Sequence, residues 1–111
     1  MINWPCILKL NNDPELLFID NQAQWDTDAD FHQGKFDELD FLIDASGCVY
    51  SLINTSHEIA FPRLTGNTKT RNEILGLVKN HAAHLDSCCV SKLYAPSIEE
   101  AYYLVKSLNE N

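Results

Sequence analysis

Residues 39–53 carry the pattern of a β-hairpin, which commits the middle of the chain to antiparallel pairing. The apolar run Phe41–Ile43 leads into Ala45-Ser46-Gly47, and Cys48–Ile53 returns. Gly47 can adopt the positive φ that a three-residue hairpin loop requires. The centre of the fold is therefore predicted to be a sheet built from neighbouring strands.

A second hairpin is predicted before the first. The strand Pro5–Leu10 alternates, residues 11–14 (Asn-Asn-Asp-Pro) form a turn cluster, and Leu16–Ile19 returns. Between the hairpins we expect a short helix from Gln22 to about Ala29, with Asn21 and Gln24 as a loose capping box.

The rest of the chain contains the stronger helix signals. Thr70 and Glu73 form a capping box, and the helix that follows carries an apolar stripe of Ile74, Leu75, Val78, His81, Ala82 and Leu85, ending near Asp86. Ser97 and Glu100 repeat the capping pattern before a last helix with Ile98, Ala101, Tyr102, Val105 and Leu108 on one face.

Two shorter segments complete the pattern. Glu58–Leu64 is expected to be a strand that Pro62 restricts to an edge or a strand end. Cys88–Leu93 is expected to be a short strand. Hairpins lead and helices follow, so we predict an α+β fold over residues 1–111: a single domain with a mainly antiparallel sheet from β-hairpins and two or three helices packed on one face.

Charge is the unusual feature of the composition. The chain has 16 acidic and 8 basic residues, a net charge of −8, and residues 1–55 hold ten of the acids with two lysines. Such a field repels nucleic acid and anionic membranes and attracts cationic partners. We therefore expect neither nucleic acid nor membrane as a partner. The plain alternative is a solvated face that keeps the protein soluble.

The sequence also favours a reducing compartment. No apolar run reaches the ~18–20 residues of a membrane span, and the N-terminus lacks the pattern of a secretory signal. Four cysteines, Cys6, Cys48, Cys88 and Cys89, lie among apolar neighbours with no CxxC pair. We expect a cytoplasmic protein with free thiols.

Several short segments together resemble a family of small uncharacterised gammaproteobacterial proteins, a domain of unknown function. The resemblance rests on Trp4-Pro5 with Ile7–Leu10, Leu42–Asp44, Gly47 with Tyr50–Leu52, His81-Ala82, Lys92–Tyr94 and Ser97–Ala101. It implies a single domain in the same compartment and assigns no catalytic residue.

Acidic residues and aromatic rings alternate in the N-terminal half. Asp26, Asp28, Asp30 and Asp37 occupy the oxygen-ligand positions 1, 3, 5 and 12 of an EF-hand loop, but Phe31 stands where that loop needs glycine. We therefore predict no calcium site. Together with Trp25, these carboxylates are the candidate contacts for a basic partner protein.

His81 and His84 are the second group of chemically interesting residues. Their i, i+3 spacing does not match the i, i+4 pattern of zincins, and His81 falls on the apolar stripe. A site from His84, Asp86 and a cysteine is conceivable but matches no known ligand spacing. The sequence therefore nominates no metal ligand, no cofactor and no catalytic residue.

The third group of candidate residues lies around the start of the first long helix. Arg63, Thr68, Lys69 and Arg71 lie near a helix N-terminus, which offers free N–H groups and partial positive charge to an anion. The P-loop pattern fails because Thr68 replaces the glycine before the lysine. The plain alternative is a capped helix start with solvated cations.

Two functions remain open. The favoured one is a small non-enzymatic interaction or regulatory protein that docks a basic partner through its acidic N-terminal half. The alternative is a small-ligand binder or minor enzyme that holds an anionic group with Arg63, Lys69 and Arg71. Partner identity and oligomeric state do not follow from the sequence.

Overall fold

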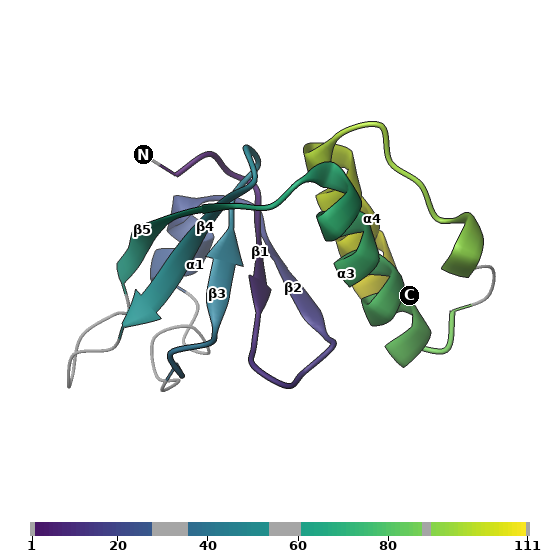
Figure 1. The fold of residues 1–111 in the computed structure, drawn as a ribbon, viewed down its shortest axis with the longest axis horizontal. Helices are drawn as coiled ribbons and strands as arrows, with labels where there is room; N and C mark the ends of the chain where they lie inside the picture. Colours follow the sequence, from purple (N-terminus) through teal and green to yellow (C-terminus); the bar gives the residue numbers. More distant parts are fainter. Residues whose placement is uncertain (1, 28–35, 54–60, 88–89, 111) are drawn as a thin grey trace.

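Five strands form one sheet in the order β2-β1-β3-β4-β5, with every neighbouring pair antiparallel. The structure, a computed structural model, describes residues 2–27, 36–53, 61–87 and 90–110. The α+β class predicted from the sequence is confirmed (Figure 1). In chain order the elements are β1 (Cys6–Lys9), β2 (Leu16–Ile19), α1 (Gln22–Thr27), β3 (Phe41–Ile43), β4 (Cys48–Ile53), β5 (Phe61–Thr68), α3 (Arg71–His84), the 3-10 helix η1 (Val90–Lys92) and α4 (Ile98–Glu110).

Both predicted hairpins are present. β1 pairs with β2 so that Cys6 lies opposite Ile19, and β3 pairs with β4 so that Ile43 lies opposite Val49. Gly47 closes the β3–β4 hairpin with a φ of 86°, the left-handed conformation that glycine adopts without steric cost. The two hairpins join through β1 and β3 to make the centre of the sheet.

The sheet is buried on both faces, because successive residues of β1 enter two different cores. Ile7 packs with α3 and α4, whereas Cys6 and Leu8 pack on the opposite face. The first core contains Ile7, Leu16, Ile43, Val49, Ile74, Leu75, Val78, Ala95, Ala101, Tyr102 and Val105. The second contains Cys6, Leu8, Ile19, Trp25, Leu42, Tyr50 and Leu52.

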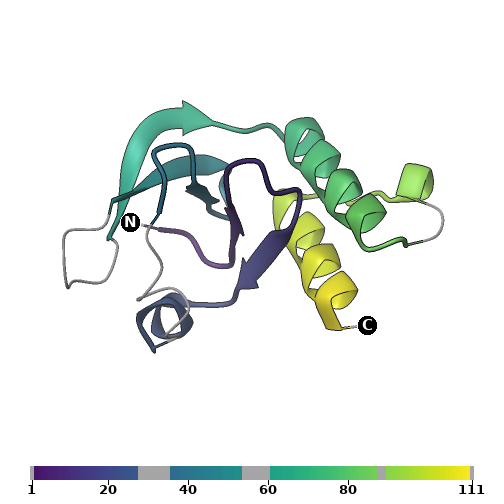
Figure 2. The same cartoon turned by 90° about the horizontal axis from the view of Figure 1, so that it is seen from below.

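The helices therefore divide between the two faces, which corrects the expectation that all of them cover one. α3 and α4 lie side by side next to β2, and α1 stands apart from them (Figure 1 and Figure 2). Trp25 of α1 places its ring in the second core. One large aromatic ring buries enough apolar area to tie a helix of fewer than two turns to a sheet.

The predicted helix boundaries agree closely with the structure. Thr70 and Glu73 form the complete capping box at the start of α3, and Asp86, with a φ of 56°, follows its C-terminal end. The Ser97 hydroxyl accepts a hydrogen bond from the Glu100 N–H at 3.2 Å at the start of α4. α1 ends at Thr27, and Ala29 lies outside the described residues.

The strand predicted over Cys88–Leu93 is wrong in its described part. Val90–Lys92 is a 3-10 helix, and the Leu93 N–H donates to the Val90 carbonyl at 3.1 Å. This segment lies against α3, away from the strands, so its backbone closes a local turn instead of a ladder. Cys88 and Cys89 lie outside the described residues.

β5 is an edge strand, as Pro62 predicted, but it extends through Gly66 to Thr68. Leu64 lies opposite Tyr50 and Thr68 opposite Cys48, so β5 has more residues between the two pairs than β4. This irregularity contains Gly66, whose φ is 84°. Across the described ranges no helix combines the length and apolar character that crossing a membrane demands.

Candidate functional site

Among the described acids between Asp13 and Asp44, two are buried and serve the fold. The Asp40 carboxylate accepts backbone hydrogen bonds from Asn11 and Asp37, both at 2.6 Å. These bonds fix the turn after β1 and the chain that leads into β3. The role of Asp40 is therefore structural. Burying a carboxylate costs free energy unless hydrogen-bond donors replace the water that it loses, and these two N–H groups do so.

Asp44 is the more heavily bonded of the two. Its carboxylate accepts backbone hydrogen bonds from Asn3 at 3.2 Å, Ser46 at 2.9 Å and Cys48 at 3.0 Å, and a fourth from the Tyr50 hydroxyl at 3.1 Å. Its carbonyl accepts from the Tyr102 hydroxyl at 2.8 Å. Asp44 thus joins the N-terminal segment, the β3–β4 turn and α4.

The groups around Asp44 hold their protons more tightly than usual. Burial, assisted by the hydrogen bond to Asp44 and by its charge, raises the pKa of Tyr50 to about 12. Burial likewise raises the pKa of Tyr102 and of the Cys6 thiol above their usual ranges. In their neutral forms these groups can donate hydrogen bonds, as the Tyr50 and Tyr102 hydroxyls do to Asp44.

Trp25 is buried, with 1% of its surface exposed, so it is not an aromatic anchor presented to a partner. Its ring stacks on Phe36 with centroids 6.1 Å apart and planes inclined by 20°. The predicted role fails for a physical reason: α1 has no other buried residue, so this ring attaches the helix to the sheet.

The remaining predicted partner contacts lie partly within the described residues. Asp26 and Asp37 are exposed, whereas Asp28 and Asp30 lie outside the described residues, as does most of the calcium-like loop. Leu39, two residues after Asp37, is 63% exposed. In the described part of this region, an exposed apolar side chain is thus a leucine that the sequence analysis did not single out.

The four residues of the candidate anion site make different local contacts. Arg63 lies opposite Ser51, and Thr68 lies opposite Cys48 at the other side of the β5 irregularity. The Lys69 ammonium lies 5.9 Å from the Phe41 ring centroid. The Arg71 guanidinium donates to the Tyr94 hydroxyl at 3.1 Å and to the Pro96 carbonyl at 3.3 Å.

The N-terminus of α3, beside these cations, already has a carboxylate of its own, that of Glu73. Glu73 accepts from the Thr70 N–H at 3.0 Å, and this bond lowers the pKa of its carboxyl. Arg71 meanwhile joins α3 to the segment before α4. The local roles of Glu73 and Arg71 are thus those of an ordinary capped helix start.

His81 is fully buried and links three elements. Its Nδ1 accepts from the Leu16 N–H at 3.0 Å, so Nε2 carries the proton and donates to Asn109 Oδ1 at 2.7 Å. Asn109 in turn donates to the Leu16 carbonyl at 3.1 Å. Side chains of α3 and α4 therefore satisfy both backbone polar groups of Leu16 on the edge strand β2.

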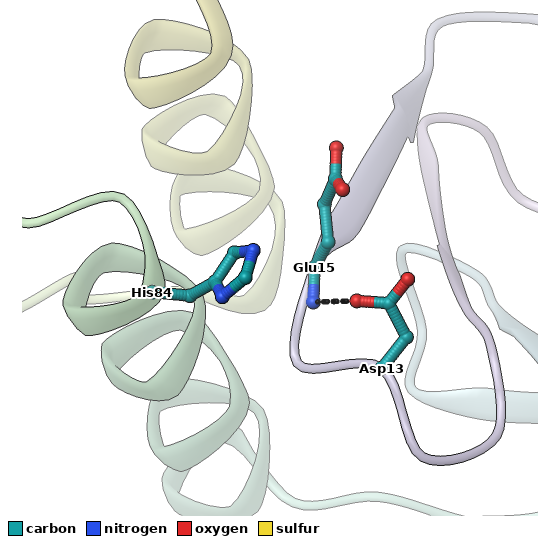
Figure 3. A group of neighbouring side chains, drawn as sticks. All are labelled: Asp13, Glu15 and His84. Atoms are coloured by element: carbon teal, nitrogen blue, oxygen red, sulfur yellow. Dashed lines mark hydrogen bonds between the residues drawn. The ribbon is translucent and has the colours of Figure 1, made fainter.

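One turn beyond His81, the structure brings three metal-ligating side chains together. Potential ligand atoms of Asp13, Glu15 and His84 lie within 4.8 Å of one another (Figure 3). Asp13 and Glu15 belong to the loop between β1 and β2, and His84 ends α3. No local spacing could reveal this group, because its members are distant in sequence and meet only through the fold.

The comparisons with known proteins agree with the fold. The solved structure of a protein from Shewanella amazonensis, determined by NMR, superposes with a TM-score of 0.72 and 22% sequence identity, covering 97% of this chain and 90% of its own. No curated protein matches the chain. The sequence model of the family DUF4144, described as a protein structure with unknown function, matches residues 4–105. The chain therefore belongs to the DUF4144 family.

Proposed function

We propose that this protein is a non-enzymatic interaction or regulatory domain that docks a basic partner protein through its acidic N-terminal half. Within that half, the docking surface consists of the exposed residues Asp26, Asp37, Glu38 and Leu39. Carboxylates at its rim attract and orient a cationic partner, and the exposed leucine supplies apolar contact. We also assign the protein to a reducing compartment such as the cytoplasm, which the free thiols of Cys6 and Cys48 support.

The observation that carries this proposal is the stack of Trp25 on Phe36. Asp26 directly follows Trp25, and Asp37 directly follows Phe36, so the stacked rings hold two exposed acids from different segments in one region. Trp25 thus supports the docking surface from beneath. Like charges held together repel each other, and a cationic partner would relieve that repulsion.

The competing explanation is that these acids only keep the protein soluble. A charge reversal separates the two. We would compare Asp26→Lys/Glu38→Lys with a matched variant, Glu99→Lys/Glu110→Lys, whose exposed acids lie on α4. Both variants change the net charge by the same amount. Asp37 is left intact because its carboxylate accepts a hydrogen bond from the Leu39 N–H.

The two variants and the native protein would serve as baits in a native lysate of the source organism. We expect basic proteins that bind the native bait and the α4 variant but not the Asp26/Glu38 variant. Their retention should also weaken at high salt, because the distance over which exposed charges interact falls from ~10 Å at ~0.1 M to ~3 Å at ~1 M ionic strength. Recovery of the same proteins with the same salt dependence by all three baits would exclude the docking surface.

A further inference from the structure

We propose that Asp13, Glu15 and His84 form a binding site for a divalent transition-metal ion, which we call the loop–helix site. Ligand atoms of the three side chains lie within 4.8 Å of one another. One imidazole nitrogen with two carboxylate oxygens is a ligand set that zinc and other first-row divalent ions accept. The proposal stands apart from the docking surface and does not depend on it.

The arrangement of these ligands is fixed by bonds that need no ion. His81 lies one turn before His84 on α3, and its imidazole binds the N–H of Leu16, the residue that follows Glu15. Asn109 binds the carbonyl of the same leucine. The end of α3 and the loop bearing Glu15 are thus held at a set separation, so an ion would meet a prepared site.

Asp13 is oriented in a similar way. Its Oδ1 accepts a hydrogen bond from the Glu15 N–H at 2.9 Å, which ties the two acidic residues into one turn (Figure 3). A carboxylate offers about four lone-pair positions, so this bond leaves acceptor capacity for an ion. Figure 3 shows the His84 ring projecting from α3 toward this turn.

The ligand set also indicates which ions would bind. Calcium requires six to eight oxygen ligands and magnesium prefers oxygen with water, so an imidazole and two carboxylates suit them poorly. Zinc accepts three protein ligands and a water in a tetrahedral arrangement. Glu15 and His84 are exposed, which leaves a route for the ion and room for that water.

Zinc binding would be measured by calorimetry on the full chain. The test variants Asp13→Asn, Glu15→Gln and His84→Gln each remove one ligand, and Asn at position 13 keeps the Oδ1 acceptor. The matched control is Asp86→Asn, two residues after His84; its backbone φ of 56° is one that asparagine tolerates. Thermal unfolding without zinc would establish that each variant folds.

We expect one zinc ion per native chain and per Asp86→Asn chain. Each test variant should bind at least about tenfold more weakly, since loss of outer-shell partners alone costs ~10–100-fold. Zinc should also raise the unfolding temperature of the native protein and of the control, because the ion binds the folded arrangement more tightly than the unfolded chain.

Cobalt would identify the ligands independently. A bound cobalt ion without a thiolate charge-transfer band supports nitrogen and oxygen ligands. A thiolate band would assign the ion to cysteines and overturn the proposal. So would the absence of one-to-one zinc binding, or an affinity that the three test substitutions leave unchanged.

Discussion

The imidazole of His81 accepts the backbone N–H of Leu16 at 3.0 Å, so a helix side chain takes the place of a neighbouring strand at the edge of the sheet. An edge strand normally presents unpaired N–H and C=O groups. Here β2 has both polar groups of Leu16 satisfied from the helical layer. This pairing explains why a histidine occupies a position on the apolar stripe of α3.

Replacing His81 by alanine should therefore lower the free energy of unfolding by about 2–5 kcal/mol. The substitution leaves the Leu16 N–H without its acceptor, which costs ~1–3 kcal/mol, and opens a cavity in addition. His84→Ala is the control, because an exposed side chain on the same helix changes stability by only ~0.5 kcal/mol. Urea unfolding of both variants in metal-free buffer would check this. If both variants lost the same free energy of unfolding, the stabilising role given to the His81 hydrogen bonds would be wrong.

Two adjacent tyrosines should respond differently to loss of their hydroxyl groups. Tyr102 is fully buried and donates to the Asp44 carbonyl at 2.8 Å, whereas Tyr103 is 43% exposed. We expect Tyr102→Phe to cost about 1 kcal/mol, and Tyr103→Phe, which keeps its ring contact with Phe18, to be nearly neutral. Denaturant midpoints would decide, and a neutral Tyr102→Phe would contradict the role given to this bond.

The protein should lose stability in alkaline solution partly through Tyr50. In the unfolded chain this phenol loses its proton near pH 10, but the folded state raises its pKa to about 12. The contribution of neutral Tyr50 is therefore complete below about pH 10 and disappears as the pH rises through about 12. Tyr50→Phe should show a shallower fall in the urea midpoint across this range. Parallel curves for the two proteins would contradict the shifted pKa.

Removal of the last helix should unfold the domain. Ala101, Tyr102 and Val105 are all buried in the core shared with α3 and the sheet. Losing one large core side chain costs ~2–5 kcal/mol, and small domains have only ~5–15 kcal/mol in total. A chain ending at Ala95 should show no cooperative thermal transition. A cooperative transition in this fragment would show that the sheet and α3 suffice.

The cysteines should all titrate as thiols once the protein is denatured, although in the native protein their reactivity should differ. Cys6 is buried and its pKa is raised by burial, so it should react with a thiol reagent only on opening of the fold. Cys48 is half-buried and should react faster. Fewer than four thiols in freshly denatured protein, or Cys6 reacting before Cys48, would contradict this prediction.

The sequence predicted those parts of the fold that are determined within a few residues. Gly47 can adopt the positive φ of a tight hairpin turn, which made the turn visible in the sequence. The structure adds a second requirement for glycine there, because the Lys69 carbonyl leaves no room for a Cβ. Thr70 and Glu73 form a reciprocal pair three residues apart, so the start of α3 was visible without any tertiary contact.

The parts that could not be predicted depend on contacts between distant segments. The single ring of Trp25 decides that α1 covers the opposite sheet face, and a helix of six residues shows no periodicity from which to infer this. Asp40 and Asp44 look like members of an acidic surface until their donors are known. The loop–helix site likewise exists only once α3 is placed beside β2.

The two edge strands of the sheet, β2 and β5, both differ from a regular open ladder. At β2, side chains of α3 and α4 satisfy the N–H and the carbonyl of Leu16. β5 contains Pro62, which has no N–H to donate, and the irregularity around Gly66. Neither border is a long, flat template on which another chain could extend the ladder. Substitutions that straighten β5 would therefore carry a hazard that stability measurements on the monomer would not reveal: the protein could remain folded and still acquire the ability to seed fibrils.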